Sequence, residues 1–288
     1  MNNKNNAFVS AIIPAYNAVN HLTRAIDSLL NQSKPLLEII IVDDGSTDTT
    51  LQIAKEYESK YKIIRIISQE NLGVSAARNV AIRESKGLYI LMLDSDDFFA
   101  ETFVEKAIQL IESEGYDAIT CGINKIVGNK TLFKWIPDQS KMNKTNVLFE
   151  NISPACCLFK RDVFYEIGFY DESFRTGFED WDFNIRFIFS DYQYGVIDEY
   201  LFSYFKTENS RSVLANLHEK EIRKLLIKKY KTHYSNYLEE FSDYATEQKS
   251  KIFLEAQKTK NSKEYRLGKA ALRPIRFLRK VLCTLINK

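Results

Sequence analysis

The chain has 288 residues, of which 45% are hydrophobic and 27% are charged, and its formal net charge is +2. This composition is typical of a globular protein, and no window reaches the roughly 18–20 apolar residues that span a bilayer. The polar N-terminus lacks the apolar core of a signal peptide. The four cysteines include no CxxC pair, which argues against a zinc site or disulfide framework, so we expect a cytoplasmic protein.

The first 120 or so residues alternate between apolar runs of strand length and segments with helical periodicity. The expected helices begin near Leu22, Asp48, Val74 and Phe103, and the expected strands are 8–13, 38–42, 63–67, 89–93 and 118–120. Pro14 is expected to end the first strand. The strands are apolar throughout, as in a parallel sheet with helices on both faces. We therefore expect an α/β fold with three layers and a mostly parallel central sheet.

The pattern loosens after about residue 122. One more strand is expected at 155–159, and helices are expected at 162–167 and 179–189. From residue 217 the chain is rich in Lys and Glu at helical spacing. We therefore expect a main domain at 1–215, with residues 1–6 flexible, and a helical extension at 216–288.

The apolar run 89–93 ends in three carboxylates within four residues, Asp94, Asp96 and Asp97. Like charges this close repel one another unless a cation neutralises them. Oxygen ligands suit Mg²⁺ or Mn²⁺, and open α/β sheets bind ligands at the carboxyl ends of their strands. The motif therefore predicts a metal site for a phosphate-bearing ligand. The alternative interpretation is a solvated acidic turn.

Two other polar loops follow expected strands, Pro14-Ala15-Tyr16-Asn17 and Asp43-Asp44-Gly45-Ser46-Thr47-Asp48. In a parallel sheet these loops and the acidic loop emerge at one edge. Together they offer an aromatic ring, hydrogen-bond acceptors and a metal, which is what a nucleotide needs. Taken alone, the second loop is also typical of a turn that caps a helix.

The chain resembles a family 2 glycosyltransferase with the GT-A fold. The resemblance covers about residues 7–210. It rests on five motifs in order, which are Ile12-Ile13-Pro14-Ala15-Tyr16-Asn17, Val42-Asp43-Asp44-Gly45-Ser46-Thr47-Asp48, Asn71-Leu72-Gly73-Val74-Ser75-Ala76-Ala77-Arg78-Asn79, Leu93-Asp94-Ser95-Asp96-Asp97 and Gly177-Phe178-Glu179-Asp180-Trp181-Asp182.

The resemblance implies how a UDP-sugar donor is bound. Pro14 and Tyr16 would lie against uracil and ribose, and Asp44 would accept a hydrogen bond from the uracil N–H. Asp94 and Asp96 would form the DxD pair that holds Mn²⁺ or Mg²⁺ on the diphosphate, where the metal acts as a Lewis acid. The implied nucleotide-binding residues are Pro14, Ala15, Tyr16, Asn17, Asp44, Gly73, Arg78, Asp94 and Ser95.

The resemblance also implies a catalytic base, Asp180. A carboxylate within hydrogen-bond reach can deprotonate an acceptor hydroxyl, and attack opposite UDP would invert the anomeric centre. Glu179 and Trp181 would line the acceptor pocket. Without the other motifs, this acidic segment would be interpreted as a favourable helix start.

The chain departs from the family in the loop after the expected base. Many members have a metal- or diphosphate-binding histidine there, whereas residues 204–210 contain none. Lys206 could contact the diphosphate instead. The three histidines, His21, His218 and His233, are interpreted as surface or packing residues.

The implied function is that of an inverting, metal-dependent hexosyltransferase. It would move a sugar from a nucleotide donor, expected to be UDP-linked, to a saccharide or lipid-linked saccharide in bacterial cell-surface polysaccharide synthesis. Two alternatives stay open, a non-catalytic nucleotide-sugar-binding or scaffold subunit and a sugar nucleotidyltransferase, although the latter normally has a Gly- and Arg/Lys-rich loop after the first strand. A phosphatase with Asp94 as nucleophile would need its DxD after the first strand. We expect no nucleic-acid partner.

Residues 258–288 contain ten Lys or Arg and one acid, Glu264, among bulky apolar residues. Such a tail can lie in the interface of an anionic membrane, which favours peripheral contact with the inner face of the cell membrane. The alternative is a helix packed on the main domain or on a second subunit in a homodimer.

Overall fold

The computed structural model describes residues 8–128, 130–205, 218–263, 265 and 267. The chain forms two compact units, residues 1–231 and 232–288. The expected flexible segment 1–6 and most of the basic tail lie outside the described residues, so membrane contact by the tail stays a prediction. Within the described ranges, no helix is both long enough and apolar enough to cross a bilayer.

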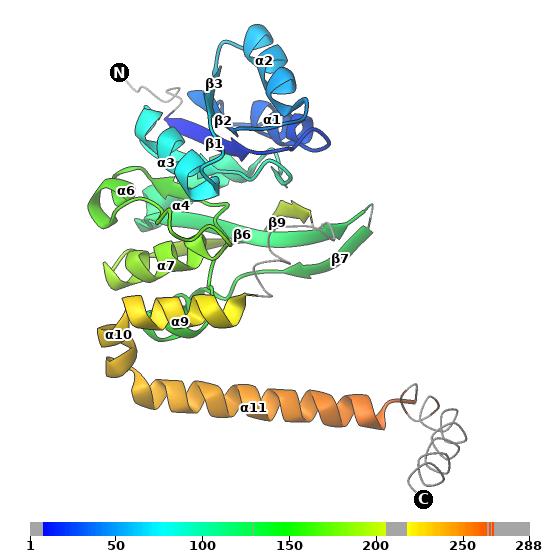
Figure 1. Cartoon of the computed structure of the whole chain (residues 1–288), viewed down its shortest axis with the longest axis vertical. Helices are drawn as coiled ribbons and strands as arrows, with labels where there is room; N and C mark the ends of the chain where they lie inside the picture. Colours follow the sequence, from blue (N-terminus) through cyan, green and yellow to red (C-terminus); the bar gives the residue numbers. More distant parts are fainter. Residues whose placement is uncertain (1–7, 129, 206–217, 264, 266, 268–288) are drawn as a thin grey trace, which may run out of the picture. The chain divides into compact units, whose positions relative to one another are not determined.

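The first unit is built on one nine-stranded sheet (Figure 1). Its order is β3-β2-β1-β4-β8-β6-β9-β5, with β7 paired to β6. The strands are β1 (Val9–Ala15), β2 (Glu38–Asp44), β3 (Ile64–Gln69), β4 (Tyr89–Met92), β5 (Phe98–Phe99), β6 (Ala118–Val127), β7 (Lys130–Trp135), β8 (Leu158–Lys160) and β9 (Tyr194–Phe205). Strands β1 to β4 are parallel, whereas β8 runs antiparallel to both β4 and β6. The expected α/β sheet is therefore present.

Helices cover the sheet on both faces, as the uniformly apolar strands predicted. Ala11 and Ile13 of β1 share a core with Leu22 and Ile26 of α1, whereas Ile12 is fully buried outside that cluster. The helices of the first unit are α1 (Leu22–Leu30), α2 (Thr50–Lys60), α3 (Val74–Glu84), α4 (Phe103–Glu114), α5 (Lys144–Phe149), α6 (Asp162–Ile167), α7 (Glu179–Phe189) and α9 (Glu219–Lys229). A short 3-10 helix spans Gln139–Lys141.

A cluster of aromatic rings from β8, α6 and α7 fixes the position of helix α7. Phe159 of β8 meets Phe164 of α6 and Phe183 of α7 edge-on, at centroid distances of 5.4 and 5.7 Å. Phe164 and Phe183 stack at 5.0 Å. Such pairs add about 0.5–1.5 kcal/mol each beyond the area they bury. The packing sets the position of the first turn of α7, which carries Asp180.

The structure corrects several expectations about strands. Pro14 does not end the first strand, because β1 continues to Ala15 and Pro14 pairs with Val42 of β2. The short strand expected at 118–120 is a ten-residue strand, β6. Strands β7 and β9 were not expected. Both pair with β6, β7 antiparallel and β9 parallel, and they extend the sheet beyond β1 to β4.

The helical C-terminal region begins inside the first unit. Ile222 and Leu226 of α9 are buried there, and Arg223 donates to the carbonyl of Phe149 at 2.8 Å. A short helix, α10 (Lys231–Asn236), follows, and the second unit contains α11 (Leu238–Asn261), none of whose residues is buried. The expected domain boundary at residue 215 stays a prediction.

Gly87 is expected to be intolerant of a side chain. A Cβ at this position would lie 2.6 Å from both the Phe8 carbonyl oxygen and the Ser10 nitrogen, which are backbone atoms that cannot rotate away. We predict that Gly87→Ala lowers the free energy of unfolding by roughly 1–3 kcal/mol. Urea denaturation measures this effect, with exposed Lys86→Ala as the matched control. Equal stability of the two variants would contradict this packing.

Candidate active site

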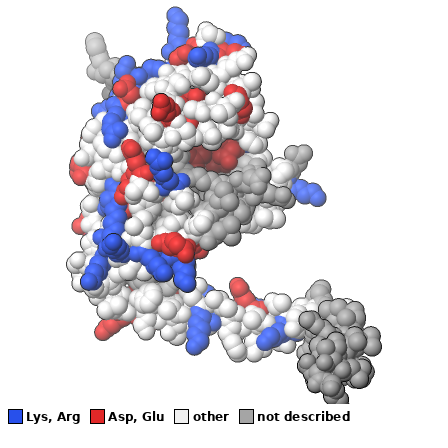
Figure 2. Space-filling view, in the orientation of Figure 1, with Lys and Arg blue, Asp and Glu red and all other residues white. Residues whose placement is uncertain are grey.

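A cleft of about 910 Å³ opens at the carboxyl ends of the parallel strands. The ends of β1 and β2 and the loops after β1, β3 and β4 line it together with the start of α7, at the sheet edge that the sequence predicted. Figure 2 shows Asp and Glu side chains gathered in a recess on one face of the molecule. Of the predicted site residues, those that line the cleft are Pro14, Ala15, Tyr16, Asn17, Asp44, Gly73, Arg78, Asp94, Ser95, Asp96, Glu179 and Asp180.

Asn17 ties the loop after β1 to the loop after β2. Its backbone N–H donates to Ser46 Oγ at 3.0 Å, and its Oδ1 accepts from the Thr47 N–H at 2.8 Å. Asn17 itself has a φ of 49°, a left-handed conformation that Asn tolerates better than most residues. The neighbouring Tyr16 ring is 50% exposed beside the cleft. The two loops therefore form one fixed wall with an accessible aromatic ring.

Asp44 organises the loop that leads into α3. Its carboxylate accepts from Gln69 Nε2 at 2.7 Å and from the backbone N–H groups of Leu72 and Gly73 at 2.9 Å. Gly73 has a φ of 96°, which favours glycine at this turn. An ionised carboxylate accepts about four hydrogen bonds, so Asp44 keeps acceptor capacity toward the cleft.

Arg78 joins the two sides of the cleft. Its guanidinium is buried and donates to Asp94 Oδ1 at 2.6 Å and to Glu179 Oε1 at 2.7 Å. Burial lowers the pKa of Arg78, but the two carboxylates outweigh this effect and hold it well above its usual value. Arg78 therefore stays charged. It links the acidic loop after β4 to the first turn of α7, where its partner Glu179 is 101 residues from Arg78 in the chain.

The carboxylates of Asp94, Asp96 and Asp97 in the acidic loop repel one another, and the nearby Arg24 offsets this repulsion only in part. Burial, together with the nearby Asp94 carboxylate, raises the pKa of Asp96 to about 6. Burial and the carboxylates of Asp96 and Asp94 raise the pKa of Asp97 well above its usual value. Arg24 donates to the backbone carbonyl of Asp96 at 2.7 Å. A bound dication would relieve this repulsion.

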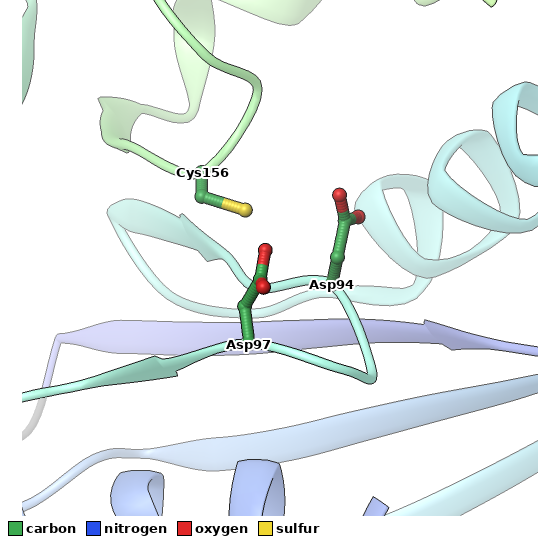
Figure 3. A group of neighbouring side chains, drawn as sticks. All are labelled: Asp94, Asp97 and Cys156. Carbon is green, nitrogen blue, oxygen red and sulfur yellow. The ribbon is translucent and has the colours of Figure 1, made fainter. Parts of the chain in front are cut away.

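Cys156 lies next to the acidic loop, and Figure 3 shows its thiol pointing toward Asp94 and Asp97. One ligand atom from each of the three lies within 4.8 Å of the others. Burial and the nearby Asp94 and Asp97 carboxylates raise the pKa of Cys156 well above its usual value, so its sulfur stays protonated and is a poor ligand. The carboxylates of Asp94 and Asp96 suit a hard ion such as Mn²⁺ or Mg²⁺.

Asp180 lies in the first turn of α7, on the cleft wall. Its carboxylate accepts from Asn151 Nδ2 and from the Trp181 N–H, both at 2.8 Å. Burial, together with the adjacent Glu179 carboxylate, raises the pKa of Asp180 to about 6. Within the described part of the chain, no Lys or Arg forms an ion pair with Asp180, because Arg78 is engaged with Glu179 and Asp94. A carboxylate with this pKa can accept a proton near neutral pH.

The expected role of Trp181 is wrong. The Trp181 side chain is 1% exposed, and its indole N–H donates to the Val147 carbonyl at 2.6 Å. Phe178 and Arg223 pack near the ring. Both faces of the indole are therefore enclosed, and neither can receive a sugar. Trp181 instead packs α7 against α5.

The cleft also contains residues that sequence reasoning did not single out. His21, interpreted as a surface or packing residue, lines the cleft, and burial together with Arg24 lowers its pKa. Asn151, which donates to Asp180, had no signal in the sequence. Residues of β6, β7 and β9 form a further wall of the cleft. The dipeptide Gly128-Asn129 between two β-rich runs could have predicted the hairpin of β6 and β7, but not the pairing with β9. Lys206 lies outside the described residues.

The model of the family "Glycosyl transferase family 2" matches residues 10–168, which contain four of the five sequence motifs. The chain belongs to this family. The family 2 match ends before Asp180. The fifth motif is therefore supported by the geometry of the cleft and not by this match.

Curated and solved relatives agree with this family. The chain is 30% identical over 216 residues to the uncharacterized glycosyltransferase EpsJ of Bacillus subtilis. The aligned region covers 70% of this chain and 62% of EpsJ. It is 47% identical over 97 residues to a chondroitin synthase of Escherichia coli, covering 34% of the chain and 14% of that protein. The chain thus matches less than two thirds of either relative.

The expected GT-A fold is confirmed by similarity to a solved structure. Residues 1–349 of S. aureus TarS, in complex with UDP-GlcNAc, match with a TM-score of 0.60 and 24% identity. The match covers 71% of this chain and 60% of the TarS chain.

Arg78 is expected to be required for folding of the cleft. Arg78→Met removes the cation that, among the described residues, pairs with both the buried Glu179 and the partly exposed Asp94, so we predict a loss of about 3–5 kcal/mol in the free energy of unfolding. Chemical denaturation measures this loss, with Arg83→Met on the exposed face of the same helix as the control. Adding Glu179→Gln to Arg78→Met should recover part of the lost stability, because it removes the buried carboxylate that Arg78 neutralised. A loss no larger than that of the control would contradict the ion-pair account.

Proposed function

We propose that the chain is an inverting, metal-dependent glycosyltransferase that moves a sugar from a UDP-sugar to a saccharide hydroxyl. One observation carries the proposal. A single cleft has an acidic, metal-suited loop on one wall and the carboxylate of Asp180, with a pKa of about 6, on another. These are the two groups that departure of UDP and deprotonation of an acceptor require.

The donor half would use the loops at the ends of β1, β2 and β4. Tyr16 offers an exposed ring for the base, and Asp44 keeps acceptor capacity for the uracil N–H. Gly73 leaves open space, because a Cβ built on it meets no atom within 4 Å. A nucleotide can therefore approach this backbone closely. Pro14, Ala15, Asn17 and Ser95 complete the proposed nucleotide site.

Asp94 and Asp96 would hold the divalent ion. When bound, the ion supplies Lewis-acid stabilisation of the charge on the departing diphosphate. Arg78 would keep the Asp94 carboxylate oriented, because its guanidinium donates to Asp94 Oδ1. Asp96 lines the cleft, and its raised pKa reports the repulsion that an ion would remove.

Asp180 would accept the proton of the incoming hydroxyl. Asn151 and the Trp181 N–H hold its two oxygens, so the carboxylate is oriented before an acceptor arrives. Glu179 would not share this role, since it is paired with Arg78. Burial, together with the neighbouring Glu179 carboxylate, keeps the pKa of Asp180 high and so makes it a stronger base.

Membership of family 2 argues against a sugar nucleotidyltransferase. A non-catalytic subunit that binds a nucleotide sugar stays the alternative, and turnover distinguishes it. Bacterial cell-surface polysaccharide synthesis, a lipid-linked acceptor, a homodimer and peripheral membrane contact are further parts of the proposal. Similarity to a chondroitin synthase supports the synthesis of a polysaccharide.

The Asp180→Asn variant is expected to lose transfer but keep donor binding. We predict a fall in kcat of about 10²–10⁴-fold, the usual contribution of a positioned base. UDP release in the presence of chondroitin tetrasaccharide and other oligosaccharide acceptors measures turnover, and calorimetric UDP binding with Mn²⁺ is the control. Unchanged turnover would rule out Asp180 as the base, and binding without any turnover in the parent protein would favour the non-catalytic alternative.

The pH profile should report the same group. The pKa of Asp180 is raised to about 6, so its protonated, inactive fraction falls as pH rises through 6. We predict that kcat/KM at saturating Mn²⁺ rises between about pH 5 and 7 and then levels off. The residual kcat/KM of the Asp180→Asn variant should not rise between pH 5 and 7. A profile that falls over the same range would contradict the assignment.

Asp96→Ala should remove the part of UDP affinity that depends on metal. Loss of even an outer metal partner costs about 10–100-fold in affinity, so a direct ligand should cost at least that much. Calorimetry with UDP in Mn²⁺ and in EDTA measures the difference, and Asp198→Ala, an exposed carboxylate outside the cleft, is the matched control. Equal UDP affinity of the two variants in Mn²⁺ would exclude Asp96 as a ligand.

A further inference from the structure

The far wall of the cleft is a patch made by three paired strands. In the β6 register, Ile123 lies opposite Trp135 of β7 on one side and opposite Phe202 of β9 on the other. Two residues further on, Lys125 lies opposite Phe133 and Tyr204 in the same way. The residues of this patch, all of which line the cleft, are Ile123, Lys125, Phe133, Trp135, Phe202 and Tyr204.

Strand geometry puts the six side chains on one face of the sheet. Residues paired across a ladder point to the same side, and so do residues two apart along a strand. The patch therefore consists of two adjacent rows, Trp135-Ile123-Phe202 and Phe133-Lys125-Tyr204. Four of its six members are aromatic, and the one charged member sits in the middle of its row.

The outer end of the patch is open. Trp135 is 43% exposed and Phe133 is 49% exposed, whereas Phe202 at the inner end is 2% exposed. The Lys125 ammonium lies 5.0 Å from the centre of the Phe133 ring. Two large aromatic rings left open to water on an edge strand lose hydrophobic stabilisation, so such a pair suggests a binding surface.

We propose that Trp135 and Phe133 bind the acceptor saccharide, with the apolar C–H face of a pyranose against the Trp135 indole. This inference rests on the proposed glycosyltransferase function. It assigns to Trp135 the stacking role that the buried Trp181 cannot fill. Asp180 lines the same cleft, so a sugar bound on the patch shares a continuous cavity with the base.

The position of the patch favours a carbohydrate over a protein partner. The aromatic pair faces the cleft, whereas Lys134, which lies between the two in sequence, is on the opposite face of β7. Leu132 is 65% exposed but does not line the cleft. A saccharide places flat apolar faces and hydroxyl groups side by side, which matches aromatic rings around a lysine.

The full-length chain reports this binding directly, because it has two tryptophans, and one of them, Trp181, is buried. Fluorescence is titrated with chondroitin tetrasaccharide, chitotetraose and cellotetraose. We expect at least one to change the emission of the parent protein, and Trp135→Phe to abolish the change. If none of the three changes the emission, or if the change persists in Trp135→Phe, the inference is overturned.

Transfer kinetics separate this inference from the proposed function. With the tetrasaccharide that binds, Trp135→Ala and Phe133→Ala should raise the acceptor KM by about tenfold or more, as truncation of buried aromatic anchors does. UDP affinity in Mn²⁺ should not change. Leu132→Ala, at an exposed residue of β7 that does not line the cleft, is the matched control and should resemble the parent.

The outcomes are distinguishable. A parent protein that neither binds UDP nor turns over would refute the glycosyltransferase proposal itself. Normal UDP binding, with the same acceptor KM in Trp135→Ala as in the parent, would overturn only the acceptor patch. An equal rise in KM for Leu132→Ala would show that damage to the hairpin, and not loss of stacking, explains the effect, and would also overturn it.

Discussion

The Arg78 guanidinium, buried between Asp94 and Glu179, is the contact on which the geometry of the cleft depends. Asp94 lies in the loop after the parallel strand β4 and Glu179 begins helix α7, so the ion pairs join the two halves of the site. Removing charges from water is costly, and a buried cation is retained only when carboxylates and hydrogen bonds compensate for the lost hydration. Because each half supplies one carboxylate, neither half alone can satisfy the guanidinium. The arrangement of the cleft is thereby coupled to its charge.

The same arrangement divides the acids of the cleft into two classes. Asp94 and Glu179 are each paired with the Arg78 guanidinium. Asp96 and Asp180 form no ion pair with Lys or Arg in the described part of the chain, and the pKa of each is raised to about 6. Raised values at two separate points of one cleft are typical of a functional site. In the proposed mechanism, Asp96 would hold a dication that stabilises the leaving diphosphate, and Asp180 would take the proton of the acceptor hydroxyl.

The donor half could be predicted from the sequence because its parts follow one another along the chain. Each apolar run ends in a polar loop, and parallel pairing brings the loops after β1, β2 and β4 to one edge. The role expected of Trp181 failed for a physical reason. A residue in the first turn of a helix can face either the ligand or the core, and only tertiary packing decides, here through the bond to the Val147 carbonyl. The role of Asn151 could not be predicted from the sequence, because its partner, Asp180, is 29 residues away and no local motif joins the two.

The wall of the cleft that we propose binds the acceptor is built from strands far apart in the sequence, so no local motif marks it. Its central pair, β6 and β9, joins strands about 80 residues apart, and among the described strands β7 pairs only with β6. Long-range pairing of this kind leaves no local motif beyond alternation and a turn. The separation has a functional consequence. Because the hairpin takes no part in the parallel pairing that fixes the nucleotide loops, its exposed side chains can change without disturbing the donor site. A fold built this way can keep one donor chemistry while the aromatic patch on β6 and β7 adapts to different acceptors.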